Sequence, residues 1–275
     1  MLRQARSKTA SPDERNPQFT ELERKPDEGN LQWGLRAVTE ISSAGPEAWS
    51  YLALLGGSDT LSFRLRIAQS QARADMLPSY WSDSIFVELA GASLDGAAAV
   101  HVPLTQPGTP SFPPRQNGVV RRPLSDFDDA VRYPNIALIA LPVPQAKILE
   151  RIDQFRHSRS TLDALEHQLR WLSFAWGVAR TGNPLNENYG LPSACMLEIA
   201  FAAENFDLTP GLESRAACPE AIWSTARVWH DYFVQTDTKV PMGRYWHPHA
   251  YSIVEPNGNQ APPPAAKARK RGGRR

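Results

Sequence analysis

The segment Leu191-Pro-Ser-Ala-Cys-Met-Leu-Glu-Ile-Ala-Phe-Ala-Ala-Glu-Asn-Phe206 holds one of the two cysteines of the chain at the start of a helical run. Pro192 and Ser193 precede that run, and both residue types are typical of helix starts. The pattern therefore predicts that Ser193 caps a helix and that Cys195 lies in its first turn. Backbone N–H groups at a helix start carry partial positive charge, which stabilises the nucleophilic thiolate form of cysteine. Cys195 is thus a candidate nucleophile; the alternative is a small core residue, since free cysteine is among the most buried residue types.

The composition is that of a globular protein. The chain has 275 residues, of which 41% are hydrophobic and 21% charged, and its formal net charge is +1. This apolar content is enough for one sizeable core, and the charge gives no strong electrostatic bias. We find no apolar run long enough to span a bilayer and no secretory signal at the N-terminus, so we expect a cytoplasmic protein. Cys195 and Cys218 form no CxxC pair, and a reducing compartment argues against a disulfide between them.

The chain divides into three parts. Residues 1–33 are polar and mixed in charge, which predicts a disordered arm, and residues 34–256 form the expected domain. Residues 257–275 are a Pro/Ala linker and a basic tail, which we also expect to be disordered. The tail has no aromatic residues for base stacking, so we expect a solvated end whose contact with nucleic acid is at most non-specific.

Strand patterns come before helix patterns in the expected domain. Apolar or alternating runs predict strands at residues 49–55, 83–89, 97–104, 118–124 and 135–142. Helical spacing predicts helices at residues 60–74, 144–156, 160–180 and 219–235, in addition to the Cys195 helix. Strands followed by helices indicate the α+β class.

Several of these segments carry a resemblance through their order along the chain. They are residues 49–57, 62–69, 80–87, 118–127, 194–200, 207–211 and 218–223. In this order they resemble the circularly permuted papain-like hydrolases of the NlpC type. The resemblance implies a permuted papain-like fold, in which an antiparallel sheet packs against helices and the cysteine lies at a helix N-terminus.

The resemblance also implies a thiol mechanism at an amide or ester bond. Cys195 matches the nucleophile, Asp83 stands where the family has its histidine, and His101 lies on the next expected strand, near the position of the third residue. His101 would then be the base, with Asp83 as the orienting group. The implied substrates are cell-wall peptides, other peptides or lipids, and no cofactor is implied.

The alternative is a catalytically inactive papain-like module that binds or assembles with a partner. An aspartate with an ordinary pKa of about 3.9 is a poor proton acceptor for a thiol, so the missing histidine favours this alternative. His101 follows Val100 on a strand and should face the opposite way. An imidazole within hydrogen-bond reach of the Cys195 sulfur would favour an enzyme, and a His101 that points away across the core would favour the binding module.

Three further histidines lie near the C-terminal end. They are His230, His247 and His249, and their spacing fits no dedicated zinc motif. We therefore expect an aromatic corner at the surface and assign no metal ligand.

Overall fold

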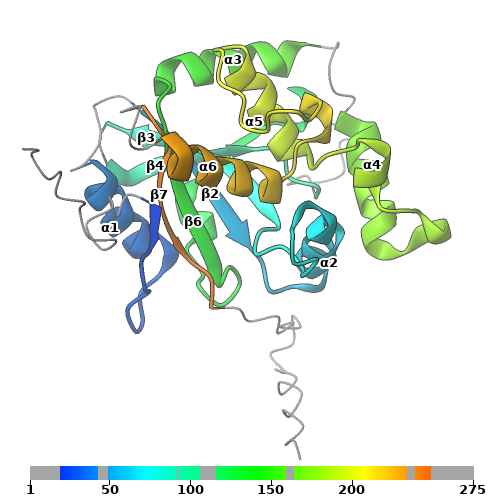
Figure 1. Cartoon of the computed structure of the whole chain (residues 1–275), viewed down its shortest axis with the longest axis horizontal. Helices are drawn as coiled ribbons and strands as arrows, with labels where there is room; N and C mark the ends of the chain where they lie inside the picture. Colours follow the sequence, from blue (N-terminus) through cyan, green and yellow to red (C-terminus); the bar gives the residue numbers. More distant parts are fainter. Residues whose placement is uncertain are drawn as a thin grey trace, which may run out of the picture.

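The computed structural model describes residues 19–42, 49–91, 93–105, 116–158, 164–233 and 239–248. These residues form a seven-stranded mixed sheet at the centre of the molecule (Figure 1). Across the sheet the order is β1 (Phe19–Glu21), β7 (Met242–Trp246), β6 (Asn135–Leu141), β2 (Ser50–Gly56), β3 (Asp83–Ala90), β4 (Ser93–His101) and β5 (Val120–Pro123). Neighbouring strands are antiparallel except β1 and β7, which are parallel. The α+β class is confirmed, and the sheet is mixed where the sequence predicted an antiparallel one.

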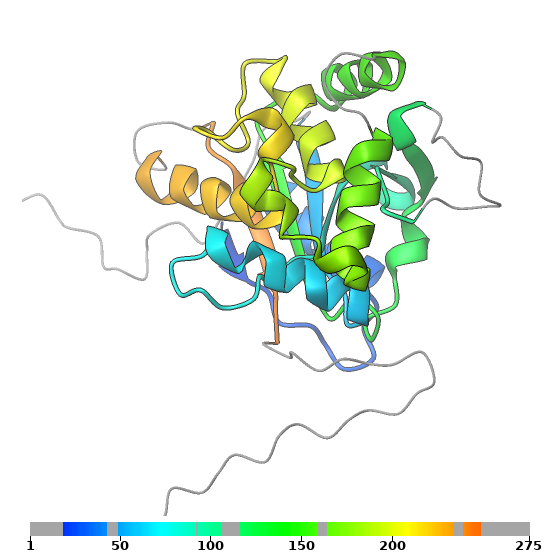
Figure 2. The same cartoon turned by 90° about the vertical axis from the view of Figure 1, so that its right-hand side faces the viewer.

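Helices cover both faces of the sheet. Helix α1 (Asn30–Ser42) packs on one face, and the other face carries α2 (Thr60–Ala68), α3 (Gln145–His157), α4 (Ala164–Trp176), α5 (Pro192–Ala202) and α6 (Pro219–Phe233). Figure 2 shows α2 and α4 in front of the sheet. Short 3-10 helices connect these elements at Gln69–Ala72, Gln116–Gly118, Leu124–Phe127, Val178–Arg180, Pro184–Glu187 and Ser214–Ala216. Among the described residues, no helix combines the length and apolarity that crossing a membrane requires.

The sheet separates two hydrophobic cores. Along β2, Leu52 and Leu54 join the core beneath α5, whereas Ala53 and Leu55 join the core beneath α1. Successive side chains of a strand point to opposite faces, so each buried strand serves both cores. This explains why β2 after Ser50 and β6 after Asn135 contain no polar side chain, a pattern typical of strands that are covered on both sides.

The folded part begins earlier than the sequence predicted. Residues 1–33 were expected to be a disordered arm, yet Phe19–Glu21 pairs with β7 and α1 begins at Asn30. Helix α1 buries Trp33, Ala37, Val38 and Ile41, which recur every three or four residues and form one helix face. The predicted tail, residues 257–275, lies outside the described residues.

The predicted helix at residues 160–180 is also shorter than expected. Helix α4 ends at Trp176, because Gly177 adopts a left-handed conformation with φ of 67° that suits glycine. Trp176, the last residue of α4, is 63% exposed.

Candidate functional site

A cavity of about 220 Å³ opens at the end of the sheet where β3 begins and β4 ends. The start of α2, the first turn of α5, β5 and the loop before β6 all contribute to its lining. Of the three predicted site residues, Asp83 and His101 line this cavity, and Cys195 does not.

Asp83 and His101 form a pair at the cavity wall. His101 Nδ1 lies 3.2 Å from Asp83 Oδ2. The register pairs Phe86 of β3 with Val100 of β4, and continuing it makes Asp83 a diagonal neighbour of His101 on the same face. An ionised carboxylate only accepts hydrogen bonds, so the pairing places the ring proton on Nδ1. The His101 side chain is buried, and its Nε2 has no hydrogen-bond partner among the described residues.

His101 and Cys195 lie on opposite faces of the sheet. Val100 and Val102 belong to the same core as Cys195. The His101 ring points the other way and meets the edge of Phe127, with 5.4 Å between ring centroids, and Phe127 belongs to the core beneath α1. The alternation along β4 thus separates the imidazole from the thiol, as expected for the binding-module alternative.

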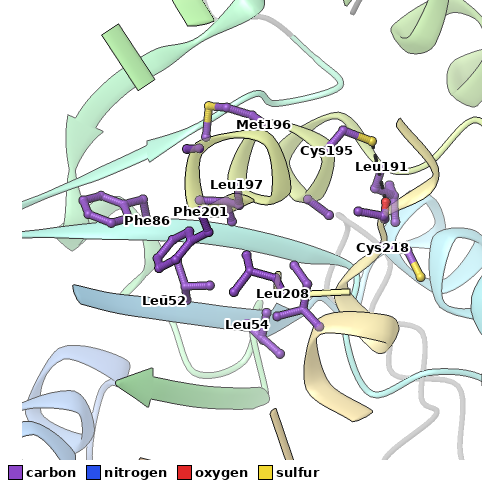
Figure 3. Packing of buried hydrophobic residues seen from close by; sticks show 14 of the residues in the cluster. Leu52, Leu54, Phe86, Leu191, Cys195, Met196, Leu197, Phe201, Leu208 and Cys218 are labelled. Atoms are coloured by element: carbon purple, nitrogen blue, oxygen red, sulfur yellow. Dashed lines mark hydrogen bonds between the residues drawn. The ribbon is translucent and has the colours of Figure 1, made fainter. Parts of the chain in front are cut away.

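Cys195 is a core residue of α5 (Figure 3). Its side chain is fully buried, and Sγ donates a hydrogen bond to the Arg215 carbonyl oxygen at 3.1 Å, with the Ala217 carbonyl oxygen at 3.7 Å. Its own amide donates to the Leu191 carbonyl, so this N–H is used inside the helix. Burial raises the pKa of the Cys195 thiol far above its ordinary value, and the neighbouring Cys218 adds to that rise. Desolvation therefore outweighs the favourable field of the helix start, and the expected stabilisation of a thiolate is wrong for this thiol.

Ser193 does not cap α5, contrary to the sequence prediction. It is the second residue of the helix, behind Pro192, and Leu191 occupies the cap position without a side-chain hydrogen bond. Ser193 Oγ donates to the Val102 carbonyl at 3.1 Å and accepts from the Val102 amide at 3.0 Å. The hydroxyl thus ties the start of α5 to the end of β4, next to His101.

Tyr133 lies among four charged side chains. Burial raises the pKa of Tyr133; Arg132 and Arg122 counteract the rise, while Asp83 and Asp59 add to it. All five residues line the cavity. Two carboxylates and two guanidinium groups therefore act on one point of this cavity.

The two acidic side chains are each held by hydrogen-bond donors. Asp59 caps α2, with Oδ1 accepting from the Ser62 amide at 2.9 Å and Oδ2 from the Ser62 hydroxyl at 2.7 Å. Asp83 Oδ1 accepts from the Ser84 amide at 2.8 Å, and its other oxygen faces His101. Both carboxylates have acceptor capacity left, because a carboxylate offers about four lone-pair directions.

The two arginines rest on aromatic rings. The Arg122 guanidinium carbon lies 4.3 Å from the centroid of Phe127, and that of Arg132 lies 5.2 Å from the centroid of Tyr133. In the described part of the chain, the one carboxylate within ion-pair distance of Arg122 is that of Asp126, 3.7 Å from Nε. This Nε is buried and has no hydrogen-bond partner there. No ion pair within the described residues joins either arginine to Asp59 or Asp83.

Asp59, Arg122, Arg132 and Tyr133 were not predicted as site residues. Only Asp59 had a sequence signal, since an aspartate directly before a helical run is typical of an N-cap. Arg122, Arg132 and Tyr133 lie close together in the sequence but far from Asp59, and only the sheet topology brings them beside it.

The C-terminal histidines form part of an aromatic cluster. The His247 ring stacks between Tyr80 and Tyr245, with centroid distances of 4.0 and 5.0 Å. His230 Nδ1 lies 2.9 Å from the Pro241 carbonyl oxygen. His249 lies outside the described residues. Within those residues, no three His, Cys, Asp or Glu side chains are grouped to hold a metal ion.

Comparisons of the chain with protein-family models, with curated proteins and with solved structures found no match.

Proposed function

We propose that this chain is a binding module whose cavity beside Asp83 and His101 takes a small ligand or the end of a partner peptide, without thiol chemistry. In this proposal the domain is a relative of the permuted papain-like hydrolases that has lost the cysteine mechanism. One observation carries the proposal: Cys195 and His101 lie on opposite faces of the sheet.

A thiol hydrolase needs a nucleophile and a base within hydrogen-bond reach of each other and of the substrate. Cys195 is buried outside the cavity, and its thiol donates hydrogen bonds to backbone carbonyls. The raised pKa of Cys195 leaves almost no thiolate at neutral pH. The cavity, in contrast, brings charged and polar groups from several elements to one place, as ligand sites do.

Alkylation by iodoacetamide tests this proposal. We expect Cys195 and Cys218 to react slowly in the folded protein at pH 7 to 9, at rates set by opening of the structure. Both thiols should react rapidly in 6 M urea, and His101→Ala should leave the ratio of the Cys195 rate to the Cys218 rate unchanged. Rapid labelling of Cys195 alone, lost in His101→Ala, would contradict the proposal.

A second candidate is the thiol-dependent hydrolase or acyl transferase acting on an amide or ester bond of a cell-wall peptide, another peptide or a lipid. The Asp83–His101 pair favours it, because a carboxylate on Nδ1 orients an imidazole so that Nε2 can accept a proton. Turnover by this route requires Cys195 Sγ to leave the Arg215 and Ala217 carbonyls and reach the cavity. Labelling of Cys195 that depends on His101 would support this candidate.

A further inference from the structure

The cavity beside Asp83 and His101 presents charges of both signs that do not neutralise each other. Asp59 and Asp83 carry the negative charges, and Arg122 and Arg132 the positive ones. Opposite charges in one cavity usually pair when their side chains can reach, because pairing compensates for lost hydration. Within the described residues these two acids and two arginines form no ion pair with each other, so the cavity lining keeps charges of both signs.

Aromatic rings position the two arginines, because the guanidinium groups stack on Phe127 and Tyr133. A stacked guanidinium can still bind a planar acceptor through its N–H groups. Carboxylates are the planar anions that arginine binds best in a bidentate way. Arg132 has no carboxylate of the described chain within ion-pair distance.

Hydrogen bonds position the two carboxylates at the starts of α2 and β3. Asp59 is fixed as the cap of α2, and Asp83 is fixed by His101 and Ser84. Neither carboxylate meets a lysine or arginine of the described chain. Each is therefore able to accept a further donor from a ligand cation.

The volume of the cavity and the apolar part of its lining limit the ligand further. The cavity volume of about 220 Å³ lies below the range of about 300–1,000 Å³ that is usual for drug-sized ligands. Leu61, Leu65 and Leu191 contribute apolar surface to the cavity lining. A ligand of one amino acid with an apolar side chain matches both features.

We propose that the cavity binds a small zwitterion of the amino-acid type, with its carboxylate toward Arg122 and Arg132 and its ammonium group toward Asp59 and Asp83. This inference rests on the proposed function and names the ligand class of the same cavity. A ligand with only one of the two charges leaves either the two arginines or the two aspartates without a partner, so it binds more weakly.

Three matched probes test the inference. L-Leucine carries both charges, N-acetyl-L-leucine carries only the carboxylate, and L-leucinamide carries only the ammonium group. Binding is followed through the amide NMR signal of Tyr133, which lies among the four charged side chains. We expect L-leucine to bind at least about tenfold more tightly than either half-probe.

Charge-removing variants assign each end of the ligand. Arg132→Gln should weaken L-leucine about tenfold and leave it no tighter than L-leucinamide. Asp83→Asn should weaken L-leucine similarly and leave it no tighter than N-acetyl-L-leucine. Arg121→Gln and Asp95→Asn serve as controls with unchanged affinity, because Arg121 and Asp95 do not line the cavity.

Two outcomes would overturn the inference. A half-probe that binds as tightly as L-leucine would show that the ligand class is wrong while the cavity still binds a ligand. No shift of the Tyr133 signal with any probe would exclude the amino-acid class. Neither outcome bears on the thiols, whose alkylation tests the proposed function separately.

Discussion

His101 on β4 and Asp83 on β3 are diagonal neighbours on one face of the sheet, with 3.2 Å between Nδ1 and Oδ2. This pair joins the two strands at the end that opens into the cavity. The carboxylate is an acceptor, so it selects the ring tautomer with the proton on Nδ1. The ring also makes a T-shaped contact with Phe127, on the face of the sheet away from Cys195.

The selected tautomer can be measured. We expect the neutral His101 ring to carry its proton on Nδ1 in the wild type, and this fraction to fall in Asp83→Ala because the acceptor is gone. Long-range 1H–15N NMR correlations distinguish the two ring nitrogens. Asp95→Ala, at the far end of β4, is the control and should leave the tautomer unchanged. An Nδ1–H fraction that is the same in Asp83→Ala would contradict the pairing.

The two buried thiols predict a loss of stability in alkaline solution. Burial raises the pKa of Cys195 far above its ordinary value and that of Cys218 to about 12, so the folded state keeps protons that the unfolded chain releases above about pH 9. The contribution of the protonated thiols to the free energy of unfolding is therefore fully present below about pH 9. It falls as the pH rises toward 12, by up to about 1.4 kcal/mol per pH unit for each thiol.

Urea unfolding at pH 8, 9 and 10 checks this prediction. Cys195→Ala and Cys218→Ala should each show a shallower alkaline decline than the wild type, and the double variant the shallowest. Comparison within this series removes the titration of lysines and tyrosines, which all four proteins share. A decline that is equally steep in all of them would mean that the thiols are not the cause.

Much of the fold could be predicted because its strands are buried on both sides. The runs at residues 49–55 and 135–142 are apolar except for Ser50 and Asn135, and they form β2 and β6. Helix α1 and strands β1 and β7 were missed. Both strands are short, and polar residues surround the apolar face of α1 in the sequence.

The candidate site could be predicted only in part, for a geometric reason. Cys195 is the fourth residue of α5, but the sequence did not show which way its side chain points. A helix turns about 100° per residue, so residues two apart lie on nearly opposite sides. Ser193 faces the end of β4, and Cys195 consequently faces residues 215–217. The pairing of Asp83 with His101 needed the β3–β4 register, which the sequence alone did not provide.

Glu198 predicts a second pH effect of known sign. It is buried in α5, and Oε2 accepts from the Thr209 amide at 2.8 Å and from the Thr209 hydroxyl at 3.0 Å. Burial raises the pKa of Glu198, although the Thr209 donors counteract the rise. The stability gained from the protonated form is present below the ordinary pKa of 4.5 and is lost as the pH rises through the raised value.

Glu198→Gln removes this titration and keeps an acceptor for Thr209. We expect the stability of Glu198→Gln relative to the wild type to increase between pH 4.5 and pH 7. Glu198→Ala should lower the free energy of unfolding by about 2 kcal/mol, because Thr209 then lacks its acceptor. Glu204→Gln is the control of opposite sign, because hydrogen bonds from Arg151 and Lys147 lower the pKa of Glu204. Its stability relative to the wild type should decrease as the pH rises toward the ordinary pKa of 4.5 and then stay level up to pH 7, as urea unfolding at pH 3, 4.5 and 7 will show.

Gly190 sets the entry of α5, and a side chain there should unfold that entry. The Gly190 amide donates to the Arg215 carbonyl at 2.7 Å, and the Leu191 amide donates to the Ala217 carbonyl at 3.0 Å. A Cβ atom on Gly190 would lie 2.1 Å from the Ala217 carbonyl oxygen, so the two segments must separate. We expect Gly190→Ala to lower the free energy of unfolding by about 2–3 kcal/mol, as overpacking of a tight contact does.

Gly182→Ala is the matched control for this substitution. A Cβ atom on Gly182 meets no atom within 4 Å, and its φ is not left-handed, so its effect should be neutral or slightly stabilising. Separation of residues 215–217 from α5 also removes the carbonyls that Cys195 Sγ contacts. Gly190→Ala should therefore also speed the alkylation of Cys195, which Gly182→Ala should not do. Equal stability and equal Cys195 alkylation in the two variants would mean that this contact does not hold α5 in place.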